Sequence, residues 1–151
     1  MISYSLNDVE VKGKLKRLIQ KTPELSRRVL SFICEAVVAH TVTQHLSGQT
    51  LKRKTGTLAK SITYKMQGDF NAKVGTNVTY AAIHEFGGTI VPREAKALVF
   101  KIKDVWVRTQ KVVMPARPYL APSIEYVMQH KAPEIMKQKA NEWLGKDWYT
   151  K

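Results

Sequence analysis

The sequence predicts an α+β fold, in which a small antiparallel β-sheet of about four strands packs against a long N-terminal helix and C-terminal helices. Apolar residues recur at helical spacing near both ends of the chain and alternate with polar residues in the middle. The resulting order is helix, helix, hairpin, short helix, hairpin, helix, which places helices on one face of an antiparallel sheet. Such a sheet needs one covered face, and a long helix over residues 22–46 is the expected cover.

Length and composition fit a single domain spanning residues 1–151. It divides into a helical N-terminal region, a sheet region with loops, C-terminal helices and a tail, at residues 1–47, 48–121, 122–145 and 146–151. A hydrophobic fraction of 44% and a charged fraction of 25% exclude a mostly disordered chain. No apolar run approaches the length of a membrane-spanning helix, so we expect no membrane partner. The single cysteine, Cys34, lies in an apolar run, which fits a buried thiol in a protein assembled in a reducing cytoplasm.

The N-terminal region is predicted to hold a short edge strand and two helices. Residues 2–6 alternate briefly, and residues 7–21 show helical spacing weakened by Gly13. Residues 22–46 form the longest predicted element, because Thr22 can cap a helix that starts with Pro23 and continues without Gly or another Pro.

The middle of the chain alternates between strand-like and turn-like stretches. The predicted elements are a loop at 48–57, strands at 61–66 and 72–75, a short helix at 79–86, a loop at 88–96, and strands at 97–103 and 105–113. In the short helix, Tyr80, Ile83 and Phe86 are predicted to form the buried face, which leaves His84 and Glu85 on the outer side.

The C-terminal region is predicted to contain two helices, at residues 122–131 and 133–144. Pro122 opens the first helix. Pro133 is expected to break or kink the segment, because a proline disfavours the helical conformation of the preceding Ala132. Gly145 ends the second helix.

We find no catalytic, cofactor-binding or metal-binding constellation in the sequence. His84-Glu85 lacks the second histidine that a zinc protease motif requires, because that position is Gly88. There is no G-x-S-x-G nucleophile motif, and the acidic residues stand apart. We therefore expect a protein that is not an enzyme and needs no cofactor.

The net charge of +13 and the pI near 9.9 leave two interpretations open. A strongly basic domain is typical of nucleic-acid binding, so a basic nucleic-acid-binding module is the alternative function. However, the excess is spread along the chain, and its one tight run is Lys52-Arg53-Lys54. A spread excess more often forms a solvated surface or one that meets an acidic partner. Trp106 beside Arg108 gives a weak nucleic-acid signal.

Three stretches in order resemble a known protein family. Residues 54–62, KTGTLAKSI, resemble the T-G-x-L-x-x-S-I signature of phage tail-completion proteins. Residues 74–77 and 80–88, VGTN and YAAIHEFGG, resemble the Y-A-x-I-H-E-x-G-G block of the phage virion morphogenesis family, which includes the Mu-like G proteins. Residues 114–120, MPARPYL, are similar to that family's P-A-R-P-[FY]-L block.

The resemblance implies a non-enzymatic minor virion protein that acts in tail completion or head–tail joining. Such proteins work as rings matched to the sixfold tail, so a hexameric homo-oligomer at the head-proximal end of the tail is expected. The implied partners are the tail tube, the tail terminator and the head–tail connector, with a nonspecific DNA contact where a neck ring surrounds DNA.

Long loops at residues 48–57 and 88–96 are predicted to project to neighbouring subunits. The candidate interaction residues are Lys52, Arg53, Lys54, His84, Glu85, Arg93 and Arg117. For Arg117 two roles stay open, because a guanidinium between two prolines can bind a neighbour's carboxylate or cap carbonyls of its own chain.

Overall fold

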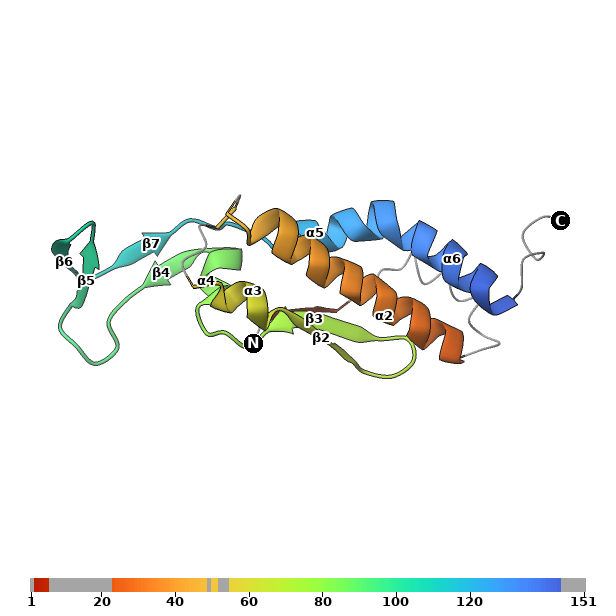
Figure 1. Ribbon diagram of the computed structural model, residues 1–151. Coiled ribbons are helices and arrows are strands. Elements are labelled where there is room, and N and C mark those ends of the chain that lie inside the picture. The colour runs from red at the N-terminus through yellow and green to blue at the C-terminus, as the bar shows by residue number, and fades with distance from the viewer. Residues whose placement is uncertain (1, 6–22, 49, 52–54, 145–151) are drawn as a thin grey trace.

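The computed structural model describes residues 2–5, 23–48, 50–51 and 55–144, and it shows an elongated molecule (Figure 1). Helices and one sheet form a body, from which a long arm of strands extends to one side. The elements are β1 (Ile2–Ser5), α2 (Pro23–His40), the π-helical turn η1 (Thr41–His45), α3 (Thr57–Ser61), β2 (Thr63–Met66), β3 (Ala72–Thr76), α4 (Ala81–Phe86), β4 (Gly88–Ile90), β5 (Leu98–Ile102), β6 (Val105–Thr109), β7 (Val112–Met114), α5 (Ala121–Tyr126), the π-helical turn η2 (Val127–Lys131) and α6 (Ala132–Leu144).

The long helix predicted over residues 22–46 is confirmed as α2 continued by η1. Leu25, Val29, Ile33 and Val37 recur at helical spacing and are buried, so one stripe of α2 forms the centre of the core. Cys34 is fully buried among them, as predicted. Burial, followed by the charge of Glu35, raises the pKa of the Cys34 thiol to about 12.

The sheet of the body has three antiparallel strands in the order β1-β3-β2. Tyr4 and Tyr64 both lie opposite the central Val74 in the register. Helix α2 packs against β2 and β3, where Ala72 and Val74 are buried. The predicted edge strand and hairpin are therefore confirmed, and the short helix α3 was not predicted. The helix predicted at residues 7–21 and its end at Gly145 lie outside the described residues.

The two separate helices predicted at residues 122–131 and 133–144 are wrong, because Pro133 does not break the segment and a π-helical turn lies just before it. Ala132 keeps helical torsions, φ −59° and ψ −40°, and η2 joins α5 to α6 without an interruption. In this π-helical turn the Ala132 N–H bonds to the Val127 carbonyl, five residues back. The wider turn gives the proline ring room beside the carbonyl with which it would otherwise clash.

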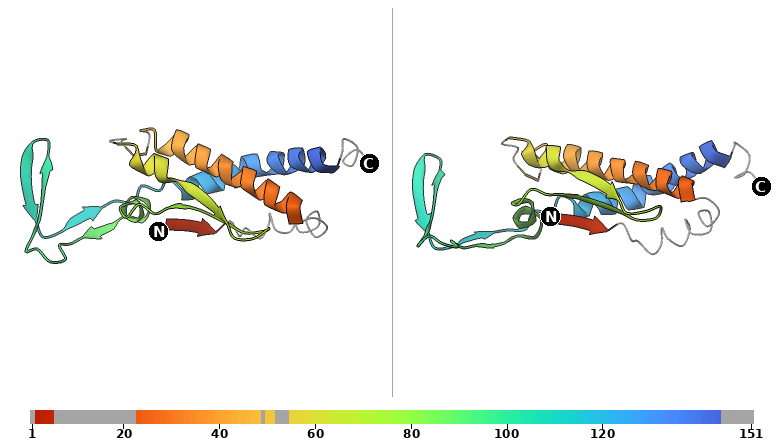
Figure 2. Two further views of the ribbon diagram at one scale, coloured as in Figure 1. Left: turned by 60° about the horizontal axis from the view of Figure 1, so that its bottom comes forward. Right: turned by 90° about the horizontal axis from the view of Figure 1, so that it is seen from below.

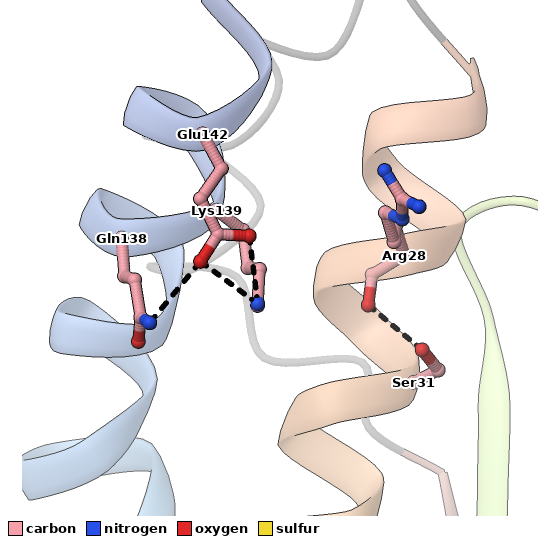
Figure 3. Close-up of polar contacts among 5 residues, drawn as sticks. All are labelled: Arg28, Ser31, Gln138, Lys139 and Glu142. Atoms are coloured by element: carbon pink, nitrogen blue, oxygen red, sulfur yellow. Dashed lines mark hydrogen bonds and ion pairs between the residues drawn. The ribbon is translucent and has the colours of Figure 1, made fainter. Parts of the chain in front are cut away.

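Helices α2 and α6 lie side by side in the body (Figure 3). The Lys139 ammonium lies 4.0 Å from the centroid of the Phe32 ring, so a cation–π contact joins the two helices. On α6 the same ammonium is 2.8 Å from the Glu142 carboxylate. That hydrogen bond lowers the pKa of the Glu142 carboxyl.

The single sheet of about four strands predicted from the sequence is wrong. The described strands form three separate antiparallel sheets, because β4 pairs with β7 and β5 pairs with β6 apart from the body sheet. Strand β4 occupies part of the predicted loop at 88–96, and the strand predicted at 105–113 is divided into β6 and β7. These four strands, residues 88–114, are the arm. Figure 2 shows the β5–β6 hairpin standing at an angle at the far end of the β4–β7 ribbon.

Candidate functional site

The base of the arm is the place where two of the stretches singled out in the sequence, residues 80–88 and 114–120, meet. Helix α4 leads into β4, and the chain returns from β7 through residues 115–120 to α5. We call residues 84–88 and 114–121 together the junction, because they connect the arm to the body on both of its strands.

Glu85 is the central residue of the junction. Its side chain is only 2% exposed. One carboxylate oxygen, Oε2, accepts hydrogen bonds from the backbone N–H groups of Tyr119 at 2.8 Å and Leu120 at 3.1 Å, and Oε1 accepts one from Ala121 at 2.9 Å. The amide groups at the start of a helix have no partner within the helix, so the carboxylate of Glu85 caps α5 from a distant part of the chain.

The predicted orientation of α4 is therefore wrong. Ala81 and Glu85, one helical turn apart, face inward, whereas Tyr80 is 43% exposed and Phe86 is 61% exposed. Helical spacing of apolar residues pointed to Tyr80, Ile83 and Phe86 as the buried face. Leaving the amide groups at the start of α5 without an acceptor would cost more free energy than exposing the aromatic rings. Glu85 therefore takes the buried position.

Gly87 and Gly88 let the two strands of the junction approach closely. Gly87 has φ +69°, and a Cβ atom there would lie 2.7 Å from the Ala116 nitrogen and 2.9 Å from the Met114 oxygen. Only glycine fits this position without moving backbone. Beside it, the Arg117 N–H donates a hydrogen bond of 2.7 Å to the His84 carbonyl. The stretches 80–88 and 114–120 therefore form one locked unit.

The first sequence stretch, residues 54–62, is linked to the second in a similar way. The hydroxyl groups of Ser61 and Thr76 are 2.6 Å apart, and the Thr76 hydroxyl also accepts from the Val78 N–H at 3.1 Å. Gly56 has φ +74° immediately before α3, a conformation that favours glycine. Residues 54–62 and 74–77 are thus linked within the body, while residues 80–88 and 114–120 hold the base of the arm.

The predicted interaction residues differ in burial and in contacts. Glu85 is buried and serves the junction. His84 is half-buried, and its ring stands edge-on to that of Tyr80 at a centroid distance of 5.9 Å. Arg93, in the arm, and Arg117 are exposed, and the Arg117 guanidinium makes no hydrogen bond to any described residue. Lys52, Arg53 and Lys54 lie outside the described residues.

A cluster of rings that the sequence did not indicate joins the C-terminal end of α2 to α5 and η2. The His40 ring stacks on Tyr126 at 4.3 Å, and Tyr126 is 4.8 Å from His130. His40 Nδ1 is 3.2 Å from the Ser123 hydroxyl. Burial, and then the charges of His45 and Lys131, lower the pKa of His40. On an α-helix, a spacing of five residues would point the side chains of His40 and His45 in different directions. The π-helical turn between them has no local sequence signal that would predict it.

Among the residues that the structure describes, no group of three or more His, Cys, Asp or Glu side chains is arranged to hold a metal ion. The arm extends from the junction, and apolar side chains on it are exposed to solvent. Val99, Ile102, Val105 and Trp106 on the β5–β6 hairpin are all more than half exposed. The geometry therefore offers an exposed apolar surface on an extended arm.

A family model described as the phage virion morphogenesis family matches residues 35–137, which include the C-terminal end of α2, the junction and the whole arm. No curated protein and no solved structure is significantly similar to the chain. No helix in the described ranges is both long and apolar enough to cross a membrane.

Proposed function

This chain belongs to the phage virion morphogenesis family, and on that premise we propose that it is a non-enzymatic structural protein of tail completion or head–tail joining. The observation that carries the proposal is the extent of the family match, because residues 35–137 contain both the junction and the arm. The family membership itself places the protein in phage virion assembly. The step in tail completion, the partners and the ring are our proposal.

We place the protein at the head-proximal end of the tail, as a hexameric ring that contacts the tail tube, the tail terminator and the head–tail connector. A closed ring requires two different surfaces on each subunit, one for each neighbour. The elongated shape supports this arrangement, because the body and the far end of the arm are separate surfaces on one chain (Figure 1).

The arrangement at the junction supports a structural role for the residues that come nearest to a catalytic pair. The Glu85 carboxylate is engaged by the backbone of residues 119–121. His84 contributes its carbonyl to Arg117. A general base has to reach a substrate proton, and a buried carboxylate committed to three amide groups is poorly placed to do so.

A nonspecific DNA contact is the second candidate function. The net charge of +13 and the exposed Trp106 opposite Lys101 favour it. Phosphate-driven binding weakens steeply as salt concentration rises. We would measure the affinity of the purified protein for a DNA duplex between about 50 and 200 mM salt. Weak binding that does not strengthen at the lower salt concentration would remove this candidate.

The test of the leading proposal is deletion of the gene from its phage or prophage, followed by electron microscopy of the induced lysate. We expect DNA-filled heads beside unattached or malformed tails, with particles restored when the gene is supplied from a plasmid. Normal infectious particles from the deletion would overturn the assignment to tail completion or joining.

A further inference from the structure

The β5–β6 hairpin at the end of the arm is a well-defined element without a core of its own. Its strands pair from Leu98 opposite Thr109 to Ile102 opposite Val105. Lys103 and Asp104 form the turn with φ values of 43° and 68°, as two-residue hairpins of this type require. Every buried hydrophobic residue of the described chain lies outside residues 82–118.

Apolar side chains of the hairpin face solvent. Trp106 is 71% exposed, Val105 64%, Val99 61% and Ile102 51%. Within the described strands, β5 and β6 pair with each other alone, so their outer edges are open. An isolated two-stranded hairpin is marginally stable in water, and exposed apolar clusters on a folded protein mark contact sites. A partner that covers the hairpin would stabilise it.

The charge of the arm specifies the chemistry of that partner. Residues 91–114 contain six Lys and Arg side chains against Glu94 and Asp104. Asp104 is already paired, because its carboxylate is 2.8 Å from the Lys101 ammonium. Lys101 lies directly opposite Trp106, and Arg108 lies opposite Val99 on the same face of the hairpin. An acidic surface with an apolar centre complements this face.

A second copy of this chain fits that requirement poorly. The protein carries 25 basic and 12 acidic side chains. The acidic side chains that the helices of the body expose are spread over three of them: Glu24 and Glu35 on α2, Glu125 on α5, and Glu134 and Glu142 on α6. Of these, Glu142 is paired with Lys139. A nucleic acid would match the basic residues and its bases can stack on Trp106, but aliphatic side chains such as Val99, Ile102 and Val105 are covered better by the apolar side chains of a protein. The observations favour a different protein.

We propose that the β5–β6 hairpin is a docking element that places Trp106 in an apolar depression with an acidic rim on another structural protein of the phage particle. The proposal rests on the function proposed above and deepens it by naming the docking element and the chemistry of its partner. Trp106 is the anchor, because a central tryptophan commonly dominates interface energetics. Lys101 and Arg108 flank it and set the charge of the rim.

A photo-crosslinking residue at position 106 tests the identity of the partner. Full-length protein with p-benzoylphenylalanine in place of Trp106 is supplied to the deletion phage, and irradiated particles are analysed by mass spectrometry. We expect a crosslink to a different virion protein, at a segment rich in Asp or Glu. A crosslink confined to a second copy of this chain, a crosslink to DNA, or no crosslink in assembled particles would overturn the proposal.

Substitutions with matched controls test the role of the contact. Tails purified from the deletion lysate are mixed with heads and added protein, and infectious titre is measured. Trp106→Ala and Arg108→Glu should each lower the titre at least tenfold, with unchanged circular dichroism. The controls are Trp143→Ala and Arg27→Glu, on exposed residues of α6 and α2 away from the hairpin, and they should complement fully (Figure 1).

The same assay separates this inference from the function on which it rests. If Trp106→Ala and Arg108→Glu complement fully, the hairpin is not a docking element. If the deletion strain still fails to complete tails, the proposed function stands all the same. Normal particles from the deletion itself would overturn the function instead.

Discussion

Glu85 links two distant parts of the chain through one carboxylate, so its loss should be costly. Glu85→Ala leaves the backbone N–H groups of residues 119–121 without this acceptor in a buried place. We expect the free energy of unfolding to fall by about 3 kcal/mol, and by less for Glu85→Gln, which retains one oxygen. Urea denaturation measures both values. Glu94→Ala, at an exposed position in the arm, is the control, and an equal effect of the two alanine variants would contradict the capping role.

Comparing alanine substitutions at Gly87 and Gly68 distinguishes the cost of backbone strain from the cost of steric overlap. Both have positive φ, +69° and +118°. A Cβ atom at Gly68 meets nothing within 4 Å, whereas one at Gly87 would overlap backbone of Met114 and Ala116. We expect Gly87→Ala to lower the thermal melting temperature clearly more than Gly68→Ala. Equal melting temperatures for the two variants would show that the junction opens easily.

Cys34 provides a probe of the core. Its thiol is fully buried, and burial raises its pKa to about 12, so little thiolate exists at neutral pH. We expect negligible reaction with a thiol reagent such as Ellman's reagent at pH 8 in the folded protein, and rapid reaction in urea. A fast native reaction would mean that α2 separates readily from the sheet.

At the level of elements, local patterns predicted the body better than the arm. The stripe on α2 and the alternation in β2 and β3 are strong, because one face of each element is buried. Strand β4 has only three residues, two of which are Gly88 and Thr89, so no alternation marks it. The division of β6 from β7 occurs where Thr109 hydrogen-bonds with the backbone of Lys111, a detail that periodicity does not encode.

The ring cluster at the two π-helical turns should make stability depend on pH. The pKa of His40 in the folded protein lies below its ordinary value of 6.5, because of burial and the charges of His45 and Lys131. Between these two pKa values the unfolded chain binds more protons, so stability is full above about pH 6.5 and falls as pH decreases through this window. The urea midpoint should therefore drop between pH 7.5 and 5.5. His40→Asn should flatten this dependence, and an unchanged slope would contradict it.

At the level of the whole molecule, the sequence predicted the α+β class and the family motifs but not how the parts are arranged. The sequence pattern predicts Glu85 on the surface, because the amide groups that bind its carboxylate lie 34 to 36 residues away along the chain. The arm was missed because its strands show ordinary strand patterns whether they join the body sheet or leave it. Long-range pairing decides between these outcomes, and a single sequence carries little information about it.

Removal of the arm beyond β4 and β7 tests whether the body folds independently of it. Ile90 lies opposite Val112 in the register, so a two-residue Asn-Gly turn can replace residues 91–111. Because the buried hydrophobic residues of the described chain lie outside residues 82–118, we expect the shortened protein to unfold cooperatively within a few degrees of the full-length melting temperature. A stable body that no longer completes tails would assign the arm to assembly. A large drop in melting temperature would instead assign part of the folding stability to the arm, and the hairpin would then be a structural element as well as a contact.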